Sequence, residues 1–359
     1  MDNGKILSIS IAAYQVEKTI GQCLDSFLES RHWHELELLV INDGSKDRTA
    51  EIVSIYVEKY PDVIKLINKD NGGHGSTINK SLSIATGKFY KVLDGDDWVD
   101  ANELDRLVEF LKKTKAELVV NRCREVYPSY SQVVGCDIDY EIGKVYDFSE
   151  VFSNKITVDN LFSMHTTTIL TDRLREVNMH ILEKCFYADT LFIYYVGLAA
   201  RSVAFHDSCA YQYRLGAEGQ SVSASGVYKH AEDLIKIERK LFSLYRLDSE
   251  RLKDNKRKEY IFTVVESRYN MLFDWFSGII TRDDKDIYML EFLDEVNRDY
   301  KDIVSKCKLS MYNRLISIYP SVLIPMFRII RKSIIWLALH RVKTLFTGNK
   351  GTMKVIDDI

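Results

Sequence analysis

Three carboxylates fall within four residues in the stretch Asp94-Gly95-Asp96-Asp97. They follow residues 89–93, whose aromatic and β-branched side chains predict a buried strand. Unpaired anions at the end of a buried strand would lose their hydration, so we expect a positive group beside them. Oxygen ligands of this kind suit Mg²⁺ or Mn²⁺, with water and phosphate oxygens in the remaining positions. The alternative is a turn with solvated acids, because Asp-Gly is common in turns.

Strands and helices alternate through the first hundred residues. Short apolar runs predict strands at residues 6–12, 36–41, 63–67 and 89–93. Apolar residues at helical spacing predict a helix after each of the first three strands. This order indicates βαβ units and an α/β fold with a mostly parallel, Rossmann-like sheet flanked by helices. A helix at 102–114 and a strand at 118–121 continue the pattern, whereas residues 122–160 are expected to be irregular.

Polar loops follow the four predicted strands at residues 13–15, 42–45, 71–76 and 94–97. Ligands of parallel sheets bind at the carboxyl ends of the strands, so these loops are expected to form one site. Glycines in the third loop would let backbone N–H groups approach a phosphate, assisted by the positive end of the following helix. The loop matches neither the dinucleotide fingerprint nor the P-loop pattern.

Residues 7–100 resemble the start of a family 2 glycosyltransferase of the GT-A fold. Order and spacing both fit over residues 8–18, 39–49, 71–79, 85–87 and 94–97. The resemblance implies a nucleotide-sugar site built from Ala12, Tyr14, Asp43, Asn71, Gly72, Gly73, Asn79 and Asp94. It also implies that Asp43 hydrogen-bonds the base, usually uracil, and that Asp94 lies near the ribose. Asp96 would hold the metal, Mn²⁺ or Mg²⁺, that bridges the diphosphate.

Three positions depart from the pattern of that family. The usual Pro-Val-Tyr-Asn is Ala-Ala-Tyr-Gln at residues 12–15, and the common Asp-Asp-Gly-Ser is Asn-Asp-Gly-Ser at residues 42–45. The frequent arginine before Asn79 is Ile78, which removes a positive group that could neutralise phosphate. Three side chains could substitute for it: Lys69, Lys80 and Arg214.

Asp189 lies between aromatic residues, just before an apolar helical run over residues 191–198. Taken alone, it is typical of a helix N-cap. It also resembles the second acid of the Glu-Asp pair in these transferases, which is the catalytic base. The first acid of that pair is Ala188 here. The resemblance therefore implies that Asp189 is the base, and the N-cap interpretation is the alternative.

The segment after that helix extends the resemblance. Residues 203–205 and 211–214 resemble the next strand of the family and its Tyr-x-Tyr-Arg ending, and residues 219–223 resemble the mobile segment that follows. His206 could add a metal ligand, but we favour a core or surface histidine. Tyrosines within residues 122–160 could act as sugar platforms, although a core or surface role is favoured for most of them.

Composition predicts an ordinary soluble protein of about two domains, from 359 residues with 46% hydrophobic side chains. We expect a catalytic domain over residues 1–225 and a helical domain over 226–359. The net charge of −3 gives no indication of nucleic-acid binding. Six scattered cysteines without a C-x-x-C pair favour a reducing compartment. Because the sequence shows neither a signal-peptide pattern nor an uncharged run of spanning length, we expect a cytoplasmic protein.

The C-terminal region combines basic and apolar side chains. Residues 301–350 contain ten Lys or Arg and one acid, Asp302, interleaved with many Ile, Leu and Phe residues. This pattern predicts a segment that lies on an anionic membrane surface, on the inner face of the cell membrane. A helix interface with another subunit, as in a homo-oligomer, is the competing interpretation.

These features together favour a metal-dependent inverting hexosyltransferase of class EC 2.4. The expected reaction moves a sugar from a UDP-sugar to a hydroxyl group of a glycan or lipid-linked glycan. The alternative is a catalytically inactive relative that binds nucleotide-sugar or acts as a scaffold. Joint retention of Asp43, Asp94, Asp96 and Asp189 favours the enzyme. A nucleotidyltransferase would need a basic, glycine-rich loop after the first strand, and residues 13–15 are not such a loop.

Overall fold

The computed structural model describes residues 4–135, 140–152, 163–216, 224–279 and 283–331. Its internal contacts divide the chain into two compact units. The first unit comprises residues 1–216 and 252–261, and the second comprises residues 217–251 and 262–359. The expected domains, 1–225 and 226–359, remain a prediction. Residues 219–223 and 332–350, to which the sequence assigned roles, lie outside the described residues.

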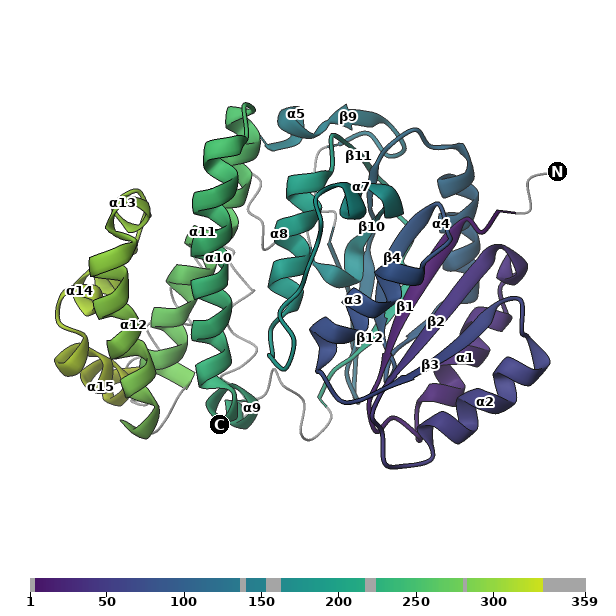
Figure 1. Ribbon diagram of the computed structural model, residues 1–359, viewed down its shortest axis with the longest axis horizontal. Helices are drawn as coiled ribbons and strands as arrows, with labels where there is room; N and C mark the ends of the chain where they lie inside the picture. Colours follow the sequence, from purple (N-terminus) through teal and green to yellow (C-terminus); the bar gives the residue numbers. More distant parts are fainter. Residues whose placement is uncertain (1–3, 136–139, 153–162, 217–223, 280–282, 332–359) are drawn as a thin grey trace. The chain divides into compact units, whose positions relative to one another are not determined.

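The first unit is built on an eight-stranded sheet with the order β3-β2-β1-β4-β10-β6-β11-β9 (Figure 1). Four neighbouring strands run parallel: β1 (Leu7–Ala13), β2 (Leu36–Asp43), β3 (Ile64–Lys69) and β4 (Phe89–Asp94). The other half holds β6 (Leu118–Val120), β9 (Val145–Asp147), β10 (Thr167–Leu170) and β11 (Ser202–Phe205). Strand β10 is antiparallel to β4 and β6, and β11 is parallel to β6. The predicted mostly parallel α/β sheet is confirmed.

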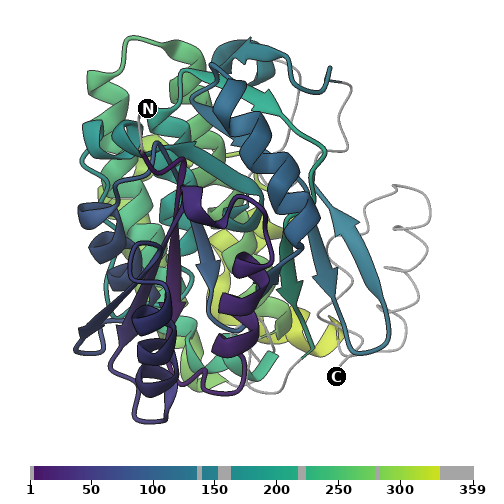
Figure 2. The same cartoon turned by 90° about the vertical axis from the view of Figure 1, so that its right-hand side faces the viewer.

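Side chains along β1 point alternately to the two faces of the sheet, and helices cover both faces. Ile9 and Ile11 join a buried cluster with apolar residues of α1 (Ile20–Leu28), α2 (Thr49–Lys59) and α4 (Ala101–Lys113). Figure 2 shows these three helices on one face of the sheet. Ser10 points to the other face, where Ser81 of α3 (His74–Ile84) donates a hydrogen bond to it over 2.6 Å. Successive strand residues alternate between faces, so β1 is buried on both sides.

A second sheet of four short strands has the order β5-β12-β7-β8. Its strands are β5 (Trp98–Val99), β7 (Cys123–Val126), β8 (Ser131–Val134) and β12 (Tyr211–Arg214). The expectation that residues 122–160 are irregular was wrong, because β7, β8, β9 and α5 (Phe148–Phe152) lie there. Strands of three or four residues are too short for an alternating hydrophobic pattern to be visible in the sequence. Most of these strands also pair with partners that are distant in the chain.

Short helices complete the first unit. These are η1 (Trp33–Glu35), η2 (Met164–Thr166), α7 (Thr171–Glu176) and α8 (Asp189–Ala199). Five buried cysteines of the described chain are free thiols: Cys23, Cys123, Cys185, Cys209 and Cys307. Cys136 lies outside the described residues.

The second unit is helical in its described part, which confirms the predicted C-terminal helical region. Its helices are α9 (Ala224–Lys229), α10 (Ala231–Arg251), α11 (Asn255–Asp274), η3 (Trp275–Ile279), η4 (Asp283–Lys285), α12 (Asp286–Asp299), α13 (Lys301–Val304), α14 (Met311–Ile318) and α15 (Pro320–Arg331). Residues 255–261 of α11 are grouped with the first unit. Aromatic packing supports the core, where the rings of Phe242 and Phe292 stack with their centroids 6.0 Å apart. Within the described ranges, every helix is too short or too polar to cross a bilayer.

Candidate active site

Register places the predicted loops at one edge of the main sheet. Ala12 of β1 pairs with Asp94 of β4, and Ala13 pairs with Asn42 of β2. Asp43 in turn pairs with Lys69 at the end of β3. Because these strands are parallel and in step, their carboxyl ends meet, and the loops that follow them start side by side. The structure therefore brings together four segments that the sequence predicted to be neighbours.

Asp43 anchors the glycine loop between β3 and α3. Its side chain is buried, and its carboxylate accepts hydrogen bonds from the Gly72 N–H over 2.9 Å and from the Gly73 N–H over 2.7 Å. Lys69 Nζ lies 2.7 Å from the same carboxylate, and the Asn71 side chain donates to the Asp43 carbonyl. Both glycine N–H groups thus have an acceptor within the protein, and their approach to a phosphate remains a prediction. Gly73 also has a φ of +78°, which a residue with a side chain rarely adopts.

Three side chains had been considered as substitutes for the missing arginine. Lys69 is held by Asp43, by the Asp70 carbonyl and by Ser76, and Lys80 is exposed. Arg214 belongs to the acid cluster, because its Nε donates to the Asp96 carbonyl over 2.9 Å. Its guanidinium group also lies 4.6 Å from the Trp98 ring centroid.

His74 is a second basic side chain beside the acids, which the sequence reasoning missed. Its Nε2 lies 3.1 Å from Asp94 Oδ1. Burial lowers the pKa of His74, but the charges of Asp94, Asp189 and Asp43 outweigh that effect, so its pKa is raised. A histidine beside glycines at the start of a predicted helix was the available signal. His74 and Arg214 are thus the basic side chains that lie beside the acids.

Burial and the mutual repulsion of the acids still raise the pKa values of Asp96 and Asp97. Burial, and then the charge of Asp94, raises the pKa of Asp96. Asp97 is buried, and burial together with Asp94 and Asp96 raises its pKa to about 9, although its carboxylate accepts hydrogen bonds from the Tyr211 hydroxyl and the Arg214 N–H. Burial also acts to raise the pKa of Asp94, but His74 and His165 outweigh it and lower that pKa.

A divalent cation fits this arrangement through one protein ligand. Among the described residues, no group of three His, Cys, Asp or Glu side chains gathers in a way that could hold a metal. Mg²⁺ bound with nucleotides commonly takes one or two carboxylates and fills its other positions with phosphate oxygens and water. Asp96, whose pKa is raised by burial and by its acidic neighbour, is suited to be that carboxylate.

Asp189 is the first residue of α8, and Ala188 occupies the N-cap position. The helix boundary therefore does not support the alternative interpretation, in which Asp189 is the N-cap. The pKa of the Tyr213 phenol is raised by burial, and further by the charges of Asp94, Asp97, Asp189 and Asp96. The charges of the predicted base and of the predicted metal ligand thus both act on the Tyr213 phenol.

Aromatic rings line the acid cluster. The His165 ring stacks on Tyr213 with centroids 4.1 Å apart and meets Tyr211 edge-on at 4.8 Å. The Asp94 N–H donates to the Tyr211 hydroxyl oxygen over 3.2 Å. The two tyrosines belong to the Tyr-x-Tyr-Arg element, whereas no signal in the sequence pointed to His165. His206 contacts Ser208 through Nδ1 and stacks on Phe110, in keeping with the structural role we favoured.

The other predicted site residues lie around this cluster. The Gly95 N–H donates to the Ala12 carbonyl over 2.9 Å, and a Cβ at Gly95 would lie only 2.7 Å from that oxygen, so β1 requires glycine between the two acids. Tyr14 is 48% exposed at the end of β1. Asn79 lies on α3, and its side chain contacts Ile181 and Glu183.

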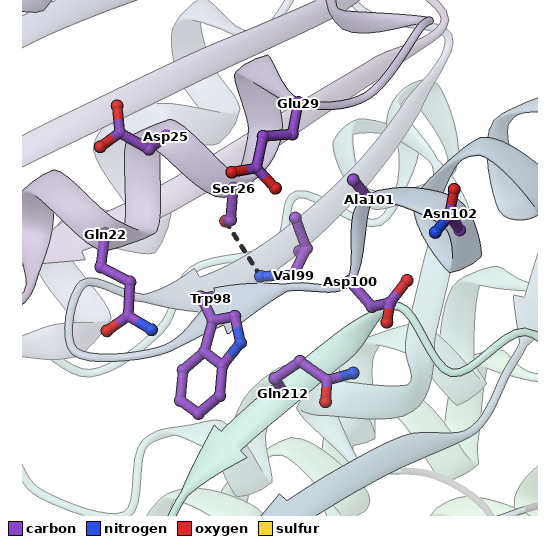
Figure 3. A pocket seen from close by; sticks show the side chains of 10 residues that line it. All are labelled: Gln22, Asp25, Ser26, Glu29, Trp98, Val99, Asp100, Ala101, Asn102 and Gln212. Carbon is purple, nitrogen blue, oxygen red and sulfur yellow. Dashed lines mark hydrogen bonds between the residues drawn. The ribbon is translucent and has the colours of Figure 1, made fainter.

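A pocket that has Trp98 among its lining residues is shown in Figure 3. It is lined by residues of α1, β5, α4 and β12, and a hydrogen bond from the Val99 N–H to Ser26 Oγ closes one wall. Its acids are Asp25, Glu29 and Asp100. The predicted site residues lie outside this lining set, so we locate the active site at the acid cluster.

Comparison with known proteins identifies the family. Residues 8–156 match the family model described as "Glycosyl transferase family 2". The putative glycosyltransferase EpsH of Bacillus subtilis (strain 168) is 26% identical over 292 residues, which cover 75% of this chain and 77% of that protein. Residues 8–156 form a family 2 glycosyltransferase domain. The uncharacterized glycosyltransferase EpsJ of the same organism is 32% identical over 114 residues, and there the match spans only 33% of the relative.

A solved structure shares the fold of this glycosyltransferase. S. aureus TarS 1–349, in complex with UDP-GlcNAc, superposes with a TM-score of 0.66 at 18% identity, over 91% of each chain. The likeness supports the GT-A fold that the sequence predicted. The acid cluster of this glycosyltransferase then lies at the carboxyl edge of a GT-A sheet.

Proposed function

We propose that this glycosyltransferase is a metal-dependent inverting hexosyltransferase. It would move a sugar from a nucleotide-sugar, most simply a UDP-sugar, to a hydroxyl group of a glycan or lipid-linked glycan. The observation that carries the proposal is the position of Asp94, followed by Asp96, at the carboxyl edge of the parallel strands, next to the loop held by Asp43. Donor and acceptor chemistry would then meet at one edge of the sheet.

On the donor side, the loops after β1, β2 and β3 would hold the nucleotide. Residues assigned to this role are Ala12, Tyr14, Asp43, Asn71, Gly72, Gly73 and Asp94. Asp43 Oδ2 accepts from Gly73, and a carboxylate oxygen can accept a second bond, such as one from the imide N–H of uracil. UDP is also the nucleotide portion of the ligand in the TarS complex. The metal site would be Asp96, and Mn²⁺ or Mg²⁺ bound there would neutralise charge on the leaving diphosphate.

On the acceptor side, Asp189 would act as general base. As the acceptor oxygen forms its bond to the anomeric carbon, the bond from that carbon to the diphosphate breaks, and Asp189 takes the hydroxyl proton. A single displacement inverts the anomeric configuration. His74 and Arg214 would supply positive charge that Ile78 lacks.

A panel of nucleotide-sugars tests this function. We expect one UDP-sugar to be slowly hydrolysed in the presence of Mn²⁺, and the hydrolysis to stop when EDTA removes the metal. Calorimetry with UDP would show binding that depends on Mn²⁺. Binding without hydrolysis of any donor would favour the inactive, nucleotide-sugar-binding relative. Hydrolysis that persists in EDTA would contradict the metal requirement.

The described part of the basic C-terminal region presents an apolar stripe on α14 and α15. Ile316 and Ile324 are buried in the second unit, yet the outer side of the same helices is also apolar. Its exposed residues are Met311, Leu315, Ile318, Tyr319, Val322, Met326 and Ile329. Exposed patches of this kind mark interaction surfaces, and the basic sequence around them favours anionic lipid. We propose that this stripe rests on the inner face of the cell membrane.

Vesicle binding tests the membrane proposal. The protein should sediment with vesicles of phosphatidylglycerol and phosphatidylcholine but much less with phosphatidylcholine alone. Replacing Ile318, Val322 and Ile329 by serine should lower the bound fraction at least fivefold, since exposed apolar side chains drive insertion. Serine at exposed Ile287 of α12 serves as the control. Equal vesicle binding by the triple variant would contradict membrane contact, and a lower oligomeric state of that variant than of the parent protein would point to a subunit interface instead.

A further inference from the structure

Asn79 makes a paired contact with the chain that leads to Asp189. Its Nδ2 donates to the Ile181 carbonyl over 2.8 Å, and its Oδ1 accepts from the Ile181 N–H, also over 2.8 Å. Nδ2 further lies 3.2 Å from Glu183 Oε1. The side-chain amide therefore bonds main-chain atoms as a neighbouring strand would, and both of its N–H groups have partners within the protein.

Two glycines of the donor loop bring the same segments close together. The Lys184 N–H donates to the Gly72 carbonyl over 2.5 Å. A Cβ at Gly75 would clash with the Leu182 carbonyl oxygen, so only glycine permits this approach of α3 to residues 181–184. Donor loop, start of α3 and residues 181–184 thus form one hydrogen-bonded unit.

The segment before Asp189 has a backbone that its own residues do not favour. Lys184 has a φ of 51° and Tyr187 a φ of 60°, both in the left-handed region that side chains disfavour. Such a backbone conformation persists only where the surrounding structure imposes it. The contacts of Asn79, Gly72 and Gly75 hold residues 181–184, which form the first half of this segment.

We propose that Asn79 is a positioning residue for the catalytic base rather than a ligand of the nucleotide. By pinning Ile181, it fixes the strained chain from which Asp189 enters α8, so the donor loop and the base are built as one piece. The proposal rests on the assignment of Asp189 as base. It replaces the nucleotide-binding role that the sequence suggested for Asn79, because the amide is already occupied.

Hydrogen–deuterium exchange tests the anchor without any substrate. In Asn79→Ala, peptides covering residues 181–188 should exchange at least fivefold faster than in the parent protein, while peptides of β1 and β2 are unchanged. Asn79→Asp, which keeps the acceptor for the Ile181 N–H, should give an intermediate increase and serves if the alanine variant folds poorly. Ser83→Ala is the matched control, since Ser83 is exposed on the same helix and bonds only its own turn through the Lys80 carbonyl. Unchanged exchange in both Asn79 variants would overturn the proposal.

Kinetics separate positioning from nucleotide binding. With the UDP-sugar that the parent protein hydrolyses, Asn79→Ala should lower kcat by about 10- to 100-fold, because small displacements of a catalytic group have effects of this size. The Kd for UDP with Mn²⁺ should stay within about threefold. Glu183→Gln, which leaves the Ile181 pair intact, should retain the parent kcat. A loss of UDP affinity as large as the loss of kcat would show that Asn79 binds nucleotide after all. The exchange measurement needs no donor. A failure of the Asn79 proposal can therefore be distinguished from a failure of the proposed glycosyltransferase function.

Discussion

Replacing Asp189 by asparagine should lower donor hydrolysis and glycosyl transfer by about 10²- to 10⁴-fold, the usual contribution of a positioned general base. Asparagine keeps the size of the side chain but cannot take a proton. The Kd for UDP should change by less than about threefold, because the proposed role of Asp189 is toward the acceptor and not toward the nucleotide. Steady-state hydrolysis and calorimetry with UDP and Mn²⁺ measure the two effects.

Asp172→Asn provides the matched control for that experiment. Asp172 also lies in the first turn of a helix, α7, but its side chain is 82% exposed. We expect the control to keep the parent kcat. If Asp189→Asn instead lost UDP binding and melted at a lower temperature, Asp189 would be a structural residue and the proposed mechanism would fail.

Replacing Asp96 by asparagine should abolish the effect of Mn²⁺ on nucleotide binding. In the parent protein, Mn²⁺ should tighten UDP binding at least tenfold, which corresponds to about 1.4 kcal/mol. The variant should bind UDP with the weak affinity that the parent shows in EDTA, because a neutral amide is a poor partner for a hard divalent cation. Calorimetric titrations of both proteins, each with Mn²⁺ and with EDTA, give the four affinities needed.

The Asp96→Asn variant also allows a check that the substitution leaves the fold intact. The Asp96 carbonyl that accepts from Arg214 is part of the main chain, so the substitution preserves that hydrogen bond. The melting temperature without metal should therefore not fall. A variant that still responds to Mn²⁺ would show that the cation binds through other residues.

The donor edge of the site could be predicted because strand order and register follow from simple patterns. Apolar runs mark β1, β2 and β4, and parallel pairing then forces Ala12, Asp43 and Asp94 to a common edge. The pattern predicted that the loop of residues 42–45 lies at this edge, and the resemblance to family 2 glycosyltransferases implied that Asp43 is its site residue. Its actual contacts were not foreseen, because a sequence does not show that one carboxylate accepts from Gly72 and Gly73 at once.

The remainder depends on contacts between distant parts of the chain. His165 reaches the acids only because β10 enters the sheet antiparallel between β4 and β6. Asn79 and Ile181 are 102 positions apart, and nothing local to either residue signals their pairing. Residues 122–160 hold strands of three or four residues, which tertiary pairing stabilises despite weak local patterns.

The β7–β8 hairpin sits at the border of the small sheet, and β8 pairs within the described strands with β7 alone. Its tip, residues 128–130, is exposed, and stacked Tyr127 and Tyr130 close it with ring centroids 4.5 Å apart. Insertions or replacements in such a peripheral ribbon cost little folding energy. A change of length or sequence in this ribbon would therefore leave the hydrogen bonds that Asp43 makes with Gly72 and Gly73 in place, because those bonds belong to the loops of the main sheet.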